Sequence, residues 1–262
     1  MNKESPHSLS TAFTIIELLT VVAILALLTC IAVPLLARAK TKSPAVGCLS
    51  NLRQLQAGWA MYADDNNGIL MPNAPTTSFS TNLWCAGTIG WGAQNANTNP
   101  IPYQISIMAH YVSSNLTIYR CPGDIVPSQN GTRLRSYSMN GQMGAPYFGS
   151  QFNPGWRTYT NEADLVCPSP RDAFVFCDEH PSSINDGLFV VSLGSPQYTD
   201  LPASYLEGGC GFSFADGHGE IHKWRSRFVF IPVVANQTPA FPIPSSPIDL
   251  DWVWLKSHSS CN

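Results

Sequence analysis

The longest hydrophobic segment of the chain lies near its N-terminus. After a short polar stretch at residues 1–12, residues 13–36 read FTIIELLTVVAILALLTCIAVPLL. A helix of this length spans about 36 Å, which is enough to cross the hydrocarbon core of a bilayer. Glu17 is the only charged residue in the run, and a carboxylate costs on the order of 3 kcal/mol in hydrocarbon. The pattern predicts a transmembrane helix over residues 13–37 in which Glu17 has a specific partner.

A second helical pattern follows this run. Apolar side chains recur at intervals of three or four residues and would form one stripe, comprising Cys48, Leu52, Leu55, Trp59 and Tyr62. The sequence DDNNG at 64–68 is a strong stop with glycine at its end. We expect a stalk helix over residues 38–67, with a break or kink at Ser43-Pro44, whose stripe packs on a folded head. An ordinary core helix would show the same stripe.

Residues 68–262 have a different pattern, of short apolar runs separated by turn residues. The chain contains 19 Gly and 21 Pro, and most of them lie in this part. Asp216-Gly217 between two alternating runs predicts a hairpin with a two-residue turn. Trp84 and Trp91 are expected in the core, because exposed indoles are costly. The predicted class is α+β, with a long N-terminal transmembrane and stalk helix packed on an antiparallel β-rich head.

Composition limits the possible functions. Charged residues make up 12% of the chain and the net charge is −3, so nucleic acid is not an expected partner. The eight cysteines include no CxxC pair, which disfavours a zinc ribbon or a thioredoxin-type motif. Their scatter fits an oxidising compartment with a few disulfides, whose pairing the sequence leaves open.

The hydrophobic run has two further interpretations. A cleaved secretory signal is one, since Ala37-Arg38-Ala39 offers a small-x-small cleavage site. The run is longer than an ordinary signal core, however, and it contains Glu17. A plain membrane anchor is the other; it explains the length of the run and leaves Glu17 unexplained.

The sequence FTIIE at 13–17, followed by LLTVVAIL, resembles the N-terminal methylation motif of type IV pilins and type II secretion pseudopilins. The resemblance implies that a prepilin peptidase cuts between Ala12 and Phe13 and that the new terminus is methylated. Glu17 then becomes the fifth residue and Pro34 the twenty-second, as in that family. In a helical polymer, Glu17 of one subunit would neutralise the terminal amine of its neighbour. Ala12 departs from the family, which usually has glycine there.

Four later segments resemble a branch of prepilin-like proteins common in planctomycete and verrucomicrobial bacteria. They are YRCPGD at 119–124, SYSMNG at 136–141, DEHPSSINDGLF at 178–189 and GFSFADGHGEIHKW at 211–224. The resemblance implies a structural subunit, not an enzyme, that anchors in the inner membrane as a single-pass protein. Its head would lie in the periplasm or on the cell surface. Its partners would be copies of itself, the peptidase and the secretion or pilus assembly machinery.

Two groups of residues are candidate metal ligands. On the predicted hairpin, His218 and Glu220 share a face and could bridge one ion; a polar outer face is the simpler explanation. In the loop after the predicted strand 173–177, Asp178, Glu179 and Asp186 offer oxygen ligands that suit calcium. The major pseudopilins carry a structural calcium, which the resemblance makes an expectation here. A solvated acidic turn is the alternative.

Two other functions remain open. A membrane-anchored periplasmic binding module, for glycans for example, would use the aromatic side chains of Trp84, Trp91 and Trp156. An anchored hydrolase would need Asp178 and Asp216 to converge in a cleft, and no hydrolase motif supports it.

Overall fold

The structure is a computed structural model that describes residues 15–76 and 78–262, with the side chains of 31–43 and of Pro146 left outside the description. The predicted leader at 1–12, and with it Ala12 and Phe13, lies outside the described residues. The chain divides at Ser43 into two units, and residues 43–262, called the globular unit below, contain the sheet. The predicted boundaries at 12, 37 and 67 stay predictions.

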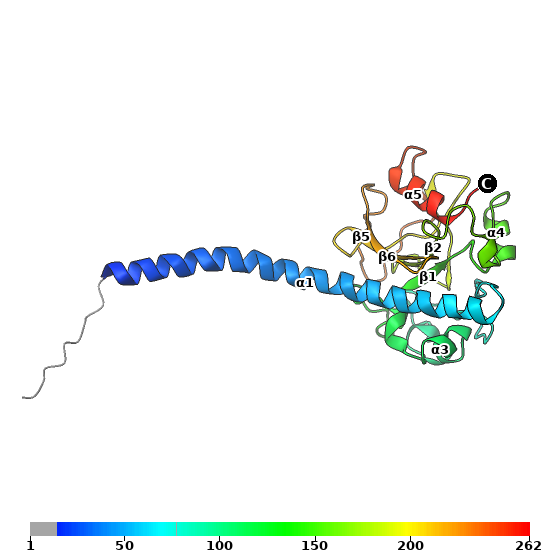
Figure 1. Cartoon of the computed structure of the whole chain (residues 1–262), viewed down its shortest axis with the longest axis horizontal. Helices are drawn as coiled ribbons and strands as arrows, with labels where there is room; N and C mark the ends of the chain where they lie inside the picture. The colour runs from blue at the N-terminus through cyan, green and yellow to red at the C-terminus, as the bar shows by residue number, and fades with distance from the viewer. Residues whose placement is uncertain (1–14, 77) are drawn as a thin grey trace, which may run out of the picture. The chain divides into compact units, whose positions relative to one another are not determined.

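One long helix, α1 (Ile15–Asp65), belongs to both units (Figure 1). Its backbone is helical through Pro34 and Pro44, so the helix does not break at Ser43-Pro44. A proline removes one backbone hydrogen bond, and neighbouring turns can keep a helix continuous around that loss.

The predicted stop of this helix is confirmed. After Asp65, the amides of Asn66 and Gly68 both donate to the carbonyl of Ala63, at 3.1 and 2.8 Å. Asn67 and Gly68 have φ of 56° and 79°, in the left-handed region that glycine and asparagine adopt at helix ends.

The predicted membrane span is not present in the described part of the chain. Over residues 15–76 and 78–262, no helix is long and apolar enough to cross a membrane. The predictions of a pilin-like fold with a transmembrane stalk helix and of a single-pass inner-membrane location are therefore wrong. The α+β class with a β-sheet core holds.

The core of the globular unit is a five-stranded sheet in the order β3-β1-β2-β5-β6. The strands are β1 (Tyr137–Asn140), β2 (Phe174–Asp178), β3 (Leu188–Phe189), β5 (Gly209–Phe214) and β6 (Gly219–Lys223). Strand β1 runs parallel to β3, and the other neighbours are antiparallel. The sheet is therefore mixed, which corrects the prediction of a purely antiparallel head. A separate ladder pairs β4 (Gln197–Tyr198) with β7 (Ile243–Pro244).

Short helices occupy the connections. They are α2 (Ile101–Gln104), α3 (Ile107–Tyr111), α4 (Pro146–Phe152) and α5 (Leu250–Ser259), with 3₁₀ turns η1 (Asn95–Asn97), η2 (Leu116–Tyr119) and η3 (Glu162–Asp164). In Figure 1, α5 lies above the sheet and the cyan half of α1 below it. Contacts agree with this layering, since Ser213 of β5 meets Gln56 of α1 while Phe212 packs against Trp254 of α5.

The sheet separates two apolar clusters. The cluster on the α1 side contains the predicted stripe, with Cys48, Leu52, Leu55 and Trp59 at 0–1% exposure, and Trp84. The cluster on the α5 side is rich in aromatic rings, including Phe174, Phe212, Trp224 and Trp252. Trp91 is also buried, so both tryptophans predicted for the core are there.

The β5–β6 hairpin has a register one residue away from the predicted one. Ser213 pairs with Gly219 and Phe212 with Glu220, and the amide of Phe214 donates to the carbonyl of His218. The loop therefore has three residues, with Gly217 at φ 91° in the left-handed position that such loops need. This shift places the phenylalanines of β5 on the same face as the histidines of β6.

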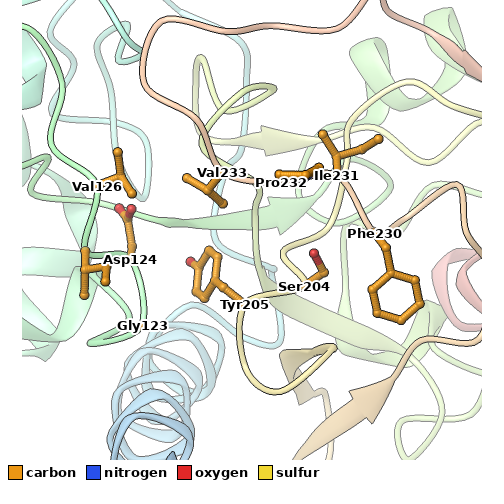
Figure 2. Close-up of a pocket in the computed structure, with 10 residues that line it drawn as sticks. Gly123, Asp124, Val126, Ser204, Tyr205, Phe230, Ile231, Pro232 and Val233 are labelled. Carbon is orange, nitrogen blue, oxygen red and sulfur yellow. The ribbon is translucent and has the colours of Figure 1, made fainter.

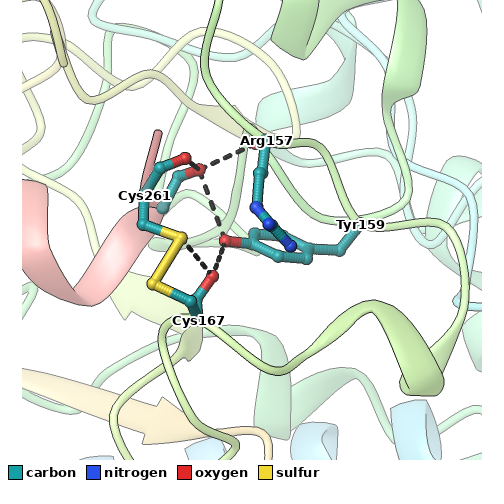
Figure 3. Close-up of a disulfide and its surroundings, with 5 residues drawn as sticks. Arg157, Tyr159, Cys167 and Cys261 are labelled. Carbon is teal, nitrogen blue, oxygen red and sulfur yellow. Dashed lines mark hydrogen bonds between the residues drawn. A yellow bond between two sulfur atoms is a disulfide. The ribbon is translucent and has the colours of Figure 1, made fainter.

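One disulfide lies within the described residues (Figure 3). Cys167, before β2, bonds to Cys261, which follows α5. The hydroxyl of Tyr159 donates to the carbonyl of Cys167 and to the hydroxyl of Ser260, and the amide of Arg157 donates to the carbonyl of Cys261. The segment after α5 is thus joined, covalently and through hydrogen bonds, to residues 157–167 that precede β2.

Replacing Leu52 by alanine should destabilise the globular unit by about 2–5 kcal/mol, because it leaves a cavity between α1 and β5. Leu52 is fully buried, and its Cδ1 lies 2.7 Å from where a Cβ on Gly211 would be. Met61→Ala on the same helix is the matched control, since Met61 is 51% exposed and its loss should change the free energy of unfolding by less than about 0.5 kcal/mol. Urea unfolding followed by tryptophan fluorescence measures both; equal effects would contradict the packing.

Candidate functional site

The first candidate site is the exposed apolar surface at the start of α1, residues 15–30, called the N-terminal apolar surface below. Its large aliphatic side chains are exposed all around the helix: Ile15, Ile16, Leu18, Leu19, Val21, Val22, Ile24, Leu25, Leu27 and Leu28, at 46–77% exposure. Its threonines add little polarity, because the hydroxyls of Thr20 and Thr29 donate to the helix carbonyls of Glu17 and Ala26. A helix that is hydrophobic all round is normally covered by something else.

Glu17 is the one charged residue on this surface. It lies in the first turn of α1, where the positive end of the helix dipole favours a carboxylate. Ala23, Ala26 and Cys30 share a helix face with small side chains, which allows another helix to approach closely. Cys30 is exposed on this surface.

The second candidate site lies in the globular unit, around the C-terminal end of β2. Asp178 and Glu179 are both fully buried, so they do not form the solvated acidic turn considered above. Asp178 accepts hydrogen bonds from the hydroxyls of Ser136 and Tyr205, at 2.7 and 2.8 Å. Burial raises the pKa of Asp178 to about 7, although these hydroxyls oppose the shift.

Glu179 belongs to a different buried network. Its oxygens accept from the hydroxyls of Ser138 and Ser183, and Arg135 in turn donates to Ser138 at 3.0 Å. Burial raises the pKa of Glu179 well above its usual value, and the nearby Asp200 raises it further. Burial also raises the pKa of Asp200 to about 8, against the hydrogen bond that it accepts from the amide of Val190. The guanidinium of Arg135 opposes the shift at Glu179, whereas Asp200 has only the amide of Val190 against its burial, so the two neighbouring acids together retain a proton near neutral pH.

The remaining predicted ligands lie elsewhere. Asp186 accepts from the amide of Leu188 and stabilises the turn before β3. His218 stacks on Phe214 and bonds through Nδ1 to Asp216, whereas Glu220 is exposed on β6. Within the described residues these side chains do not join a group of three or more His, Cys, Asp or Glu ligands. The expected calcium stays a prediction.

The residues behind the two alternative functions are dispersed. Trp84 is fully buried and donates from Nε1 to Asn73 and Gly187. Trp91 is buried beneath the guanidinium of Arg133. Of the three indoles, only that of Trp156 is half-buried. A sugar would therefore meet at most one of the three indoles.

The two aspartates of the hydrolase alternative also lie apart. Asp178 ends β2, while the amide of Asp216 bonds to Pro170, before that strand begins. The five residues of β2 between them extend about 15 Å. Asp216 is exposed and Asp178 is buried, so the two carboxylates share no cleft.

The second site contains two cysteines that were not among the candidate metal ligands predicted from the sequence. Cys48 of α1 and Cys121, just after η2, lie with Asp178 in one buried group whose ligand atoms are all within 4.8 Å of one another. Cys48 begins the apolar stripe of α1, and Cys121 belongs to the segment YRCPGD at 119–124. Their proximity depends on long-range packing, which spacing along the chain does not reveal.

A cavity of about 470 Å³ opens beside this group (Figure 2). Its walls are mostly apolar, with Val126, Phe230 and Val233 among them, and Tyr205 stands between the cavity and Asp178. Asp124, also in the wall, is held by Arg133 at 2.9 Å. The volume is that of a small-molecule pocket, but the side chains of Tyr205 and Asp124 in its wall already have protein partners.

Comparisons with protein-family models, with curated proteins and with solved structures gave no match. The interpretation of both sites therefore depends on their own geometry.

Replacing Asp200 by asparagine should flatten the pH dependence of stability. A carboxyl that titrates near 4 when unfolded and near 8 when folded retains a proton only in the folded state between these values, so raising the pH favours unfolding. The slope for one proton is about 1.4 kcal/mol per pH unit, and the asparagine keeps an acceptor for the amide of Val190. Urea unfolding from pH 5 to 8 should show a smaller loss of stability in Asp200→Asn than in the parent. The exposed control Asp64→Asn should follow the parent; an unchanged slope in Asp200→Asn would contradict the prediction.

Proposed function

We propose that this chain is a structural subunit that assembles with copies of itself through the N-terminal apolar surface, in a pilus-like or pseudopilus-like fibre. The exposed aliphatic side chains of residues 15–30 are the observation that carries the proposal. Leaving so many of them in water is unfavourable at about 25 cal/mol per Å². An identical helix from a second copy offers a complementary apolar surface, and the small side chains at Ala23 and Ala26 let two such helices come close.

Glu17 supplies the specificity of this assembly. Apolar helices packed together leave a carboxylate in a medium of low dielectric, where it is stable only with a cationic partner. Cleavage between Ala12 and Phe13, as the FTIIE resemblance implies, would create an ammonium at Phe13 four residues before Glu17. We assign the role of cationic partner to the ammonium of a neighbouring copy. The prepilin peptidase and the fibre assembly machinery are then the further partners.

Glu17→Ala should abolish or strongly reduce fibre formation while the globular unit stays folded. The chain is produced together with a prepilin peptidase, and mass spectrometry establishes whether its terminus is methylated Phe13. Sedimentation velocity and negative-stain electron microscopy then measure assembly, and near-ultraviolet circular dichroism measures folding. Glu162→Ala, which removes an exposed carboxylate of the globular unit, should assemble like the parent. Normal fibres from processed Glu17→Ala would refute the charge pairing.

Ile24→Lys should also prevent assembly, because a lysine ammonium cannot be buried between apolar helices without a partner. Ile24 is 58% exposed on the N-terminal apolar surface, and Met61, 51% exposed further along α1, is the matched site. Met61→Lys should leave assembly intact. In the parent, the exposed thiol of Cys30 should become protected from maleimide as fibres form. Equal assembly of both lysine variants would exclude this surface as the interface.

A further inference from the structure

The buried group formed by Cys48, Cys121 and Asp178 has the donor set of a metal site. The thiol of Cys48 lies 3.8 Å from Oδ2 of Asp178, and all three ligand atoms lie within 4.8 Å of one another. Two sulfurs and one oxygen around a tetrahedral Zn²⁺ lie about 3.5–3.8 Å apart, as follows from bond lengths of about 2.3 and 2.0 Å. Small rotations of the side chains would therefore bring them to coordination distance.

Hydrogen-bond donors, which favour negatively charged ligand atoms, point at each of the three groups. The hydroxyl of Tyr137 donates to the sulfur of Cys48 at 3.3 Å, and the amide of Gly123 donates to the sulfur of Cys121 at 3.4 Å. Oδ1 of Asp178 receives the hydroxyls of Ser136 and Tyr205, which leaves Oδ2 directed at Cys48. In metal sites, hydrogen bonds from neighbouring groups commonly hold the ligand side chains in the orientation that coordination needs.

Over residues 15–76 and 78–262, no ion pair joins a cationic side chain to any of these three groups. Arg133 forms an ion pair with Asp124, and Arg135 donates a hydrogen bond to Ser138, which in turn donates to Glu179. A divalent cation would allow all three ligands to ionise and would leave the site with one net negative charge.

We propose that Cys48, Cys121 and Asp178 bind a thiophilic divalent cation of the zinc class. The cation would join α1 to the segment after η2 and to the end of β2. A fourth position of the tetrahedron is left for water. Cys121 also lines a second cavity, of about 420 Å³, with Asn51, Thr117 and Pro122. The site is separate from the N-terminal apolar surface, and its existence does not depend on the proposed assembly.

A disulfide between Cys48 and Cys121 is the main competing state. It would occupy both sulfurs and exclude the metal, but it gives no reason for a buried carboxylate aimed at Cys48. The two states differ in measurable ways, because a disulfide removes two hydrogen atoms from the mass of the chain and leaves no thiol to alkylate.

The test uses the full chain, purified without oxidant, exchanged into buffer with excess Zn²⁺ and then freed of unbound metal. Elemental analysis should find one zinc per chain. Co²⁺ in its place should give a thiolate-to-metal charge-transfer band and the visible absorption of tetrahedral cobalt. Cys48→Ala and Cys121→Ala should each weaken zinc binding at least tenfold. Cys85→Ala is the matched control, since Cys85 is a free, buried cysteine outside the group, and it should bind like the parent.

Circular dichroism shows which variants are folded, and Asp178→Asn, which keeps an acceptor for Ser136 and Tyr205, gives a third ligand variant of nearly unchanged shape. It too should lose at least tenfold in affinity. The proposal is overturned if the folded, reduced parent takes up no zinc, or if bound zinc survives in all three ligand variants. It is also overturned if the chain as isolated has a Cys48–Cys121 disulfide and binds no zinc after that bond is reduced.

Discussion

The packing of the second half of α1 on the sheet is the constraint on which the rest of the globular unit depends. The stripe from Cys48 to Trp59 is fully buried, and the closest approach is at Gly211 of β5, where a Cβ would come within 2.7 Å of Leu52 and 2.8 Å of Cys48. Only glycine allows the helix to lie so near this strand. With the helix fixed there, Cys48 reaches the end of β2, and the position of the whole buried polar group follows.

That contact also explains why buried carboxylates are tolerated in this core. Asp178 is surrounded by hydroxyls, and Glu179 by hydroxyls and the guanidinium of Arg135, so each has partners although solvent is absent. A buried polar group that keeps all its hydrogen bonds costs little, whereas one that loses a partner costs about 1–3 kcal/mol. The two networks therefore fix the mutual positions of β1, β2 and the loop after β2 more strictly than apolar packing would.

Local pattern was enough to predict several features, because each depends on neighbours in sequence. The helix stop at Asp65, the stripe that Leu52 and Leu55 share, and the burial of Trp84 are of this kind. The register of the hairpin was missed by one residue, because two- and three-residue loops around Gly217 have nearly the same sequence. The observed register turns His222 of β6 toward α5, where it stacks on Trp254, a contact with a segment distant in sequence. The parallel pairing of β1 with β3 and the proximity of Cys48 to Cys121 depend on contacts between residues far apart in the sequence, which the spacing of residues along the chain does not reveal.

The two halves of α1 differ in how their apolar side chains are distributed around the helix and in what covers them. From Cys48 onward, apolar side chains occupy one stripe, and the sheet of the same chain covers them. Between Ile15 and Leu28 they surround the helix, and within the described residues nothing of the chain covers them. A surface that is apolar on every side cannot be satisfied by one flat partner, since a single contact would leave the opposite side in water. In the fibre that we propose, a helical array of identical subunits would place several neighbours around each helix. A single acidic residue near the start of such a helix then sets the register, because only one stagger between neighbours brings it to a cationic group.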